Sequence, residues 1–277
     1  MCGIVCYVGE RDACPLLIEG LKHLEYRGYD SAGVAIHDGK NVNCHKSVGK
    51  IAALEARLEG STPKGITGIA HTRWATHGEP SEANVHPHSD GAGDVFVIHN
   101  GIIENYLSHK KRLEKGGVVF RSETDTEVLA HLISMNFEGN LAEAVRKTMG
   151  QVEGTFGLAV LHRGCPDEIV VARRGSPIII GIGEDGHFAA SDVSAMVRYT
   201  DKVVHLLDNE MATLRKKDFS IATAQAKPIE RNSETVEWHA EDIELNGFPH
   251  FMLKEIFEQP ETINNAIRGR IEAGGGG

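Results

Sequence analysis

Cys2 directly follows the initiator methionine and precedes an apolar segment that runs from Gly3 to Gly9. If Met1 is removed, this cysteine carries its own α-amino group, whose ordinary pKa of about 7.7 to 8.0 suits a general base near neutral pH. Nucleophile and base then belong to one residue, which is the N-terminal form of the nucleophile-plus-base arrangement. The alternative is that Cys2 is a small, buried and inert strand cysteine.

A polar cluster, residues 71–78, follows a predicted strand and leads into a long loop. Arg73 carries a planar guanidinium that suits a substrate carboxylate. Thr76 and His77 offer hydrogen-bonding groups beside it, and Trp74 offers an apolar lid. The alternative interpretation of this cluster is a surface turn of mixed polar residues.

Two further segments each have a structural and a chemical interpretation. The pair Asn100-Gly101 is typical of a turn after a strand, but its side-chain amide and backbone N–H also suit an oxyanion hole. The acidic stretch 122–127 is typical of a capped helix start, with Ser122 or Thr124 as the cap. In the chemical interpretation, Asp125 of this stretch holds a substrate ammonium group.

Histidines recur at positions 71, 77, 86, 88 and 99 and suggest a metal site. Their spacing matches no standard zinc pattern, so we interpret them as surface histidines or as supports for neighbouring site residues. We therefore expect no metal site.

The composition of the chain is that of an ordinary globular protein. It has 277 residues, 41% of them hydrophobic, and a formal net charge of -10. This charge disfavours nucleic acid and anionic membranes as partners. There is no apolar run of the roughly 20 residues that span a bilayer, no secretory signal pattern and no CxxC pair among the five cysteines. We therefore expect a cytoplasmic protein with free thiols.

Hydrophobic periodicity predicts an alternation of strands and helices, followed after Gly154 by closely spaced strands. Two stacked, mostly antiparallel sheets with helices outside accommodate this order. The predicted helices are 12–24, 51–58, 104–115, 126–135 and 141–149. The predicted strands are 3–9, 31–37, 41–48, 66–72, 94–99, 156–162, 168–172, 178–182, 187–190, 202–207 and 211–214.

The C-terminal stretch differs from the rest of the chain. Residues 248–271 have helical spacing that we expect Pro260 to break, and four glycines end the sequence. We expect a principal domain over residues 2–240, a linker to a further domain over 241–271, and a tail over 272–277. The tail is interpreted as an artificial boundary, with a flexible natural tail as the alternative.

Taken together, these stretches resemble the class II glutamine amidotransferases, whose glutaminase domains are N-terminal nucleophile (Ntn) hydrolases. The segments that carry the resemblance are CGIV at the start, EYRGYDSAG at 25–33, HTRWATHGEPSEANVHPH at 71–88, HNGIIENY at 99–106 and SETDTEV at 122–128. It continues through GTFGLAV at 154–160 and ARRGSPIIIG at 172–181 to HFMLKEIFEQP at 250–260. The resemblance implies an α+β fold, a four-layer αββα sandwich of the Ntn hydrolase type.

The resemblance also implies a role for each matching site residue. Cys2 would be the nucleophile with its free amine as the base, and Asn100 and Gly101 would form the oxyanion hole. The substrate-binding residues would be Arg73 for the α-carboxylate, Thr76 and His77 beside it, Asp125 for the α-ammonium, Trp74 as a gate on the ammonia path, and Arg27 close to the nucleophile.

The implied reaction is hydrolysis of L-glutamine through a γ-glutamyl thioester, without a cofactor. The stretches match most closely the members that pass the ammonia to fructose 6-phosphate in a sugar-isomerase (synthase) half of the same full-length enzyme. That half is missing from this sequence. Two alternatives stay open: a redox- or metal-responsive binding protein built on thiols and histidines, and an Ntn amidase that acts on other amides.

Overall fold

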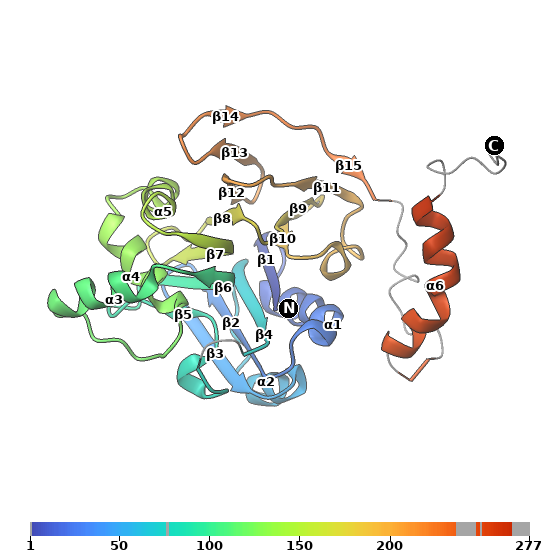
Figure 1. The fold of residues 1–277 in the computed structure, drawn as a ribbon, viewed down its shortest axis with the longest axis horizontal. Coiled ribbons are helices and arrows are strands. Elements are labelled where there is room, and N and C mark those ends of the chain that lie inside the picture. The colour runs from blue at the N-terminus through green and yellow to red at the C-terminus, as the bar shows by residue number, and fades with distance from the viewer. Residues whose placement is uncertain (1, 76–77, 237–247, 250, 268–277) are drawn as a thin grey trace, which may run out of the picture. The chain divides into compact units, whose positions relative to one another are not determined.

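The computed structural model describes residues 2–75, 78–236, 248–249 and 251–267. The chain divides into two compact units, residues 1–238 and 239–277 (Figure 1). The second unit contains one described helix, α6 (Phe251–Ile267). The first unit contains all the described strands and the remaining helices.

Two antiparallel sheets form the centre of the first unit. The first sheet has the strand order β15-β11-β9-β10-β1-β4-β2-β3, and the second has the order β14-β13-β12-β8-β7-β6-β5. The strands of the first sheet are β1 (Gly3–Gly9), β2 (Ser31–His37), β3 (Val42–Val48), β4 (Thr67–Arg73), β9 (Ile179–Ile182), β10 (Gly186–Ala190), β11 (Lys202–His205) and β15 (Glu234–Thr235). Those of the second are β5 (His88–Ser89), β6 (Val95–Ile103), β7 (Gly154–His162), β8 (Glu168–Arg174), β12 (Glu210–Arg215), β13 (Phe219–Thr223) and β14 (Pro228–Ile229).

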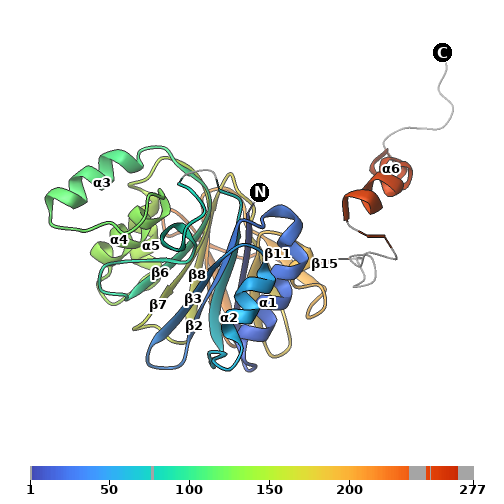
Figure 2. The ribbon, with the colours of Figure 1, turned by 90° about the horizontal axis from the view of Figure 1, so that it is seen from below.

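Helices cover the outer face of each sheet, as Figures 1 and 2 show. On the first sheet lie α1 (Ala13–Leu24) and α2 (Ile51–Leu58), and on the second lie α4 (Thr126–Asn136) and α5 (Leu141–Met149), with α3 (Tyr106–Lys115) beside α4. Three short 3₁₀ turns complete the unit: η1 (Glu25–Arg27), η2 (Glu82–Asn84) and η3 (Val193–Ala195). This arrangement confirms the predicted four-layer αββα sandwich. In the described part of the chain, none of the helices combines the length and apolarity that a membrane span requires.

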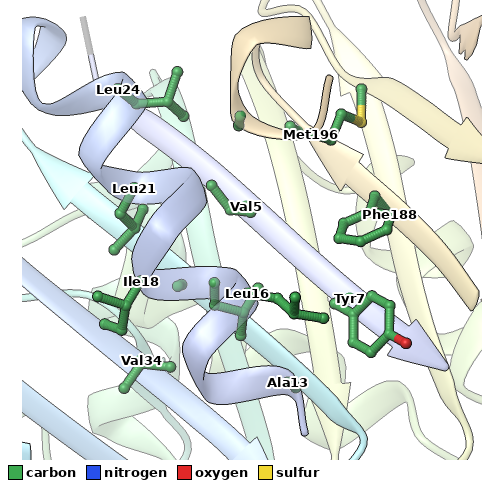
Figure 3. Close-up of a cluster of buried hydrophobic side chains, with 14 of the residues drawn as sticks. Val5, Tyr7, Ala13, Leu16, Ile18, Leu21, Leu24, Val34, Phe188 and Met196 are labelled. Atoms are coloured by element: carbon green, nitrogen blue, oxygen red, sulfur yellow. The ribbon is translucent and has the colours of Figure 1, made fainter. Parts of the chain in front are cut away.

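The central strand β1 is buried on both sides, which explains its continuous apolar sequence. Because side chains alternate along a strand, Val5 and Tyr7 face α1 while Ile4, Cys6 and Val8 face the second sheet. Figure 3 shows the first set packed against α1. Burying a large apolar side chain contributes about 1.5 to 3 kcal/mol, so the head of β1 is held in place by its own core residues.

Most predicted elements are confirmed within one or two residues, including 3–9, 31–37, 51–58 and 141–149. Four short strands were not predicted: β5, β13, β14 and β15. The expected break at Pro260 is wrong, because α6 continues through this residue. Neither Ser122 nor Thr124 is the helix cap, since Asp125 occupies the N-cap position of α4.

Candidate active site

Cys2 lies at the head of β1, where the chain has little free space. The backbone N–H of Gly3 donates to Thr72 Oγ1 of β4 at 3.1 Å. A Cβ atom on Gly3 would lie 2.7 Å from both this oxygen and Leu24 Cβ of α1, closer than real Cβ contacts come. Glycine at position 3 therefore allows α1 and β4 to pack closely around the start of β1. This packing fixes the position of Cys2.

The thiol of Cys2 contacts the end of β4. The backbone N–H of Trp74 donates to Cys2 Sγ at 3.2 Å, and the thiol is 3.6 Å from the Trp74 carbonyl oxygen, which accepts from it. Burial raises the pKa of the Cys2 thiol above its ordinary value, and the Trp74 N–H and the Arg73 guanidinium only partly oppose this. The thiol is therefore protonated at neutral pH, and nucleophilic attack requires a base.

Asn100 and Gly101 lie within β6, so the interpretation as a turn that ends the strand at His99 is wrong. Asn100 Nδ2 donates to the carbonyl oxygen of Cys2 at 2.9 Å. Gly101 has a φ of +130°, and a Cβ atom there would lie 2.1 Å from the carbonyl oxygen of Thr155 on β7. Only glycine fits this position, and it lies in the same cavity as Cys2.

Arg73, the last residue of β4, is 3% exposed, and its Nη2 donates to the carbonyl oxygen of Gly78 at 3.3 Å. Burial lowers the pKa of its guanidinium, while the Asp30 and Asp125 carboxylates oppose this change. The predicted neighbours Thr76 and His77 lie outside the described residues.

Asp125 occupies the N-cap position of α4, but its carboxylate does not cap that helix. Instead, Oδ2 accepts the backbone N–H of Ile103 on β6 at 2.8 Å, and Oδ1 is 3.5 Å from the hydroxyl of Thr126. The side chain is buried and lines the same cavity as Arg73. A carboxylate at this position suits a cationic partner such as an ammonium group.

Trp74 and Arg27 lie at the same cavity. Trp74 is 46% exposed, and its ring meets the Tyr29 ring edge-on, with centroids 5.4 Å apart. Arg27 of η1 forms an ion pair with Asp192 and donates from Nε to the Tyr26 hydroxyl at 3.0 Å. This ion pair ties η1 to the segment after β10.

One cavity of about 290 Å³ brings together every described residue that the sequence predicted for the site. They come from the heads and ends of β1, β4 and β6, from η1 and from the start of α4. Its lining residues are Cys2, Arg27, Arg73, Trp74, His86, His99, Asn100, Gly101, Ile102, Thr124, Asp125, Thr126, Thr155, Ser176, Pro177 and Ser191.

The described histidines of the expected set are buried, so the interpretation as surface residues is wrong, and they support the site. His71 Nε2 lies 2.9 Å from Asn100 Oδ1, while His86 Nε2 and His99 Nδ1 lie 2.9 and 3.1 Å from Thr126 Oγ1. Burial lowers the pKa of His71 to about 3. Among the described residues, no group of three or more His, Cys, Asp or Glu side chains is placed to hold a metal ion.

Sequence reasoning missed several residues that shape the cavity. Asp30 Oδ2 accepts the backbone N–H of Ala75 at 2.8 Å and so fixes the segment after Trp74. Ser191 Oγ accepts the backbone N–H of Ile4 at 3.1 Å. Asp30 lies inside the EYRGYDSAG stretch, which contributed to the family resemblance but did not predict this contact. Ser191 had no signal in the sequence, because only the pairing of β1 with β10 brings it to the Ile4 N–H and to the cavity.

Comparisons with known proteins identify relatives of this chain. A family model described as a glutamine amidotransferase domain matches residues 71–198. The chain is 49% identical over 270 residues to a glutamine–fructose-6-phosphate aminotransferase (isomerizing) of Aquifex aeolicus, and 47% identical over 272 residues to one of Thermus thermophilus. These matches cover 97% and 98% of this chain but 45% of each relative, so the chain spans less than half the length of these relatives.

Solved structures give the same result for the fold. A glutamine phosphoribosylpyrophosphate amidotransferase from B. subtilis matches with a TM-score of 0.71 and 28% identity, over 80% of this chain and 49% of the other. A regulatory enzyme of purine biosynthesis matches with a TM-score of 0.72 and 27% identity, with the same coverage. The first of these neighbours is named as an amidotransferase, and neither neighbour supports the alternative of a thiol- or metal-responsive binding protein. The chain therefore contains a glutamine amidotransferase domain of the Ntn hydrolase fold and is similar to the corresponding part of the glutamine–fructose-6-phosphate aminotransferases.

Proposed function

We propose that this chain hydrolyses L-glutamine to glutamate and ammonia through a γ-glutamyl thioester on Cys2. The observation that supports this proposal is the single cavity shared by Cys2, Asn100, Gly101, Arg73 and Asp125. It places a thiol, two hydrogen-bond donors, a cation and an anion around one small volume. A free amino acid with a side-chain amide presents the complementary groups.

In the proposed reaction, the α-amino group of Cys2 takes the thiol proton, directly or through water. The sulfur then attacks the side-chain amide carbon of glutamine. The protonated amine returns the proton to the amide nitrogen, so that ammonia leaves and a thioester remains. The same amine activates a water molecule, which hydrolyses the thioester and releases glutamate. Asn100 Nδ2 and the Gly101 N–H stabilise the oxyanion in both steps. The amine acts only when Met1 is absent, because an acylated amine has no basic lone pair.

Recognition of the substrate rests on two opposite charges that line the same cavity, the Arg73 guanidinium and the Asp125 carboxylate. The Arg73 guanidinium binds the α-carboxylate of glutamine, with Thr76 and His77 beside it, and the Asp125 carboxylate binds the α-ammonium. Because both groups are buried, a ligand that lacks either charge leaves a desolvated charge unpaired. The domain therefore selects free glutamine over a glutamine side chain within a peptide.

We further propose that the domain works as part of a longer enzyme. Its relatives are named glutamine–fructose-6-phosphate aminotransferases. In this proposal the ammonia is transferred to fructose 6-phosphate, giving glucosamine 6-phosphate in a synthase half of the same full-length enzyme. In this proposal, residues 2–240 are the glutaminase domain, 241–271 lead to the synthase half, and 272–277 are a tail. Trp74 controls the passage of ammonia, Arg27 supports the segment beside the nucleophile, and the enzyme is cytoplasmic.

The test is covalent labelling by 6-diazo-5-oxo-norleucine, a γ-electrophile that resembles glutamine. Protein whose first residue is Cys2 is incubated with the reagent, and the intact mass and the labelled peptide are measured. One adduct per chain on Cys2, blocked by excess glutamine, is expected. The Cys165→Ser variant, which changes a cysteine that does not line the cavity, should label equally well. Absence of labelling at Cys2 in correctly processed protein refutes the proposal.

A further inference from the structure

The hydrogen bonds around Asn100 define the orientation of its side chain. The Cys2 carbonyl oxygen is only an acceptor, so the amide group of Asn100 that lies 2.9 Å away must be the NH₂. The amide oxygen then faces His71, whose Nε2 lies 2.9 Å from it. An amide oxygen cannot donate, so His71 carries its proton on Nε2 and donates to Asn100.

This contact joins the two sheets at the nucleophile. His71 lies on β4 opposite Ile4 of β1, on the face that packs against the second sheet. Asn100 follows Phe96 and Ile98 on the inward face of β6, since side chains alternate along the strand. The chain of contacts therefore runs from β4 through Asn100 on β6 to the carbonyl of Cys2 on β1.

The His71 ring is itself held in place. It packs against the ring of His86 with centroids 4.3 Å apart, and His71 is 1% exposed. His86 Nε2 in turn lies 2.9 Å from Thr126 Oγ1 of α4. Burial keeps the pKa of His71 at about 3, so at neutral pH the ring carries one N–H, which is the one directed at Asn100.

We infer that His71 is a positioning residue for the glutaminase reaction, holding the Asn100 side chain so that its second N–H faces the oxyanion. One N–H of the Asn100 amide donates to the Cys2 carbonyl, and the amide oxygen of Asn100 accepts from His71. These two contacts fix the direction of the second N–H. Without His71, only the Cys2 carbonyl holds the amide, so the side chain can turn about its terminal bond and direct the second N–H away from the oxyanion. This inference rests on the proposed oxyanion role of Asn100.

The experiment is a double-mutant cycle on glutamine hydrolysis, measured as kcat and KM in protein whose first residue is Cys2. Removing one oxyanion donor costs about 100- to 1,000-fold in kcat, which is the expected loss for Asn100→Ala. His71→Leu should lower kcat by at least about tenfold, but by less than Asn100→Ala does, because this substitution misdirects the Asn100 donor without removing it. KM should change less than threefold. In the Asn100→Ala background, His71→Leu should change kcat less than about twofold.

Rescue and control variants separate positioning from simple loss of packing. His71→Gln places an amide N–H the same number of bonds from Cβ as Nε2 and should recover most of the activity. His187→Leu is the matched control. His187 is also buried, and its Nδ1 donates to the carbonyl oxygen of Arg215 at 2.7 Å. It pairs with Val8, six residues or about 20 Å along β1 from Cys2. His187→Leu should lower the melting temperature and leave kcat unchanged.

Two results overturn the inference: His71→Leu with unchanged kcat while Asn100→Ala is impaired, or an equal loss from His71→Leu in both backgrounds. If His71→Leu does not fold, His71→Asn takes its place, since its side chain is polar but too short to reach Asn100. An Asn100→Ala variant with full activity would instead refute the proposed oxyanion hole itself.

Discussion

Asp125 offers a quantitative test of substrate recognition, because one substitution separates its charge from its structural contact. The carboxylate is 5% exposed and accepts the Ile103 N–H at 2.8 Å. Asp125→Asn keeps an oxygen for this N–H and removes the negative charge. A hydrogen bond to a charged group is worth about 1.5 to 3 kcal/mol, so KM for glutamine should rise about 10- to 150-fold. The kcat should change much less, because the ammonium is remote from the reacting amide.

The assay compares glutamine with 4-carbamoylbutyrate, the same molecule without its α-amino group. The unsubstituted protein should strongly prefer glutamine, and Asp125→Asn should lose most of this preference. Asp125→Ala should show a similar loss of preference and also a lower melting temperature, since it leaves the Ile103 N–H without its acceptor. If Asp125→Asn keeps the KM for glutamine and the preference over the deaminated analogue, Asp125 does not bind the ammonium.

Two further substitutions or conditions test the architecture of the site. Gly101→Ala should lower kcat at least about 100-fold and reduce the melting temperature, because the new Cβ would lie 2.1 Å from the Thr155 carbonyl; activity within tenfold of the parent would refute the predicted oxyanion geometry. The free energy of unfolding should fall as the pH drops from 6.5 toward 3, because burial lowers the pKa values of His71, His86 and His88 and the unfolded chain binds protons that the folded chain does not. Each histidine that stays neutral in the folded protein lowers the free energy of unfolding by about 1.4 kcal/mol for each pH unit below 6.5. Urea unfolding at pH 7.5 and 5.5 measures the loss, His71→Gln should reduce it, and equal stability at both pH values would contradict the reasoning.

Local sequence determined most of the secondary structure and the identity of the reactive residues. The apolar run 3–9 predicted a strand, and the structure buries this strand on both faces. Asp38-Gly39, between the predicted strands 31–37 and 41–48, is a typical hairpin pair, and Gly39 has a φ of +96° in the turn between β2 and β3. Local sequence patterns gave the wrong prediction where a contact with a distant strand determines the structure. Asn100-Gly101 has a turn sequence, but pairing with β7 continues the strand through it to Ile103.

The residue types of the site were likewise visible in the sequence, since thiol, guanidinium, carboxylate and amide each suggest a partner. Their convergence was not, because Cys2, Arg73, Asn100 and Asp125 lie on four separate elements of the fold. Only the stacking of the two sheets brings β6 and the start of α4 against the head of β1. The same stacking buries His71 and directs its single N–H to Asn100, a contact between residues 29 positions apart that no periodicity encodes. The sequence by itself therefore determined which groups can react, and the tertiary structure decided which of them meet and in what orientation.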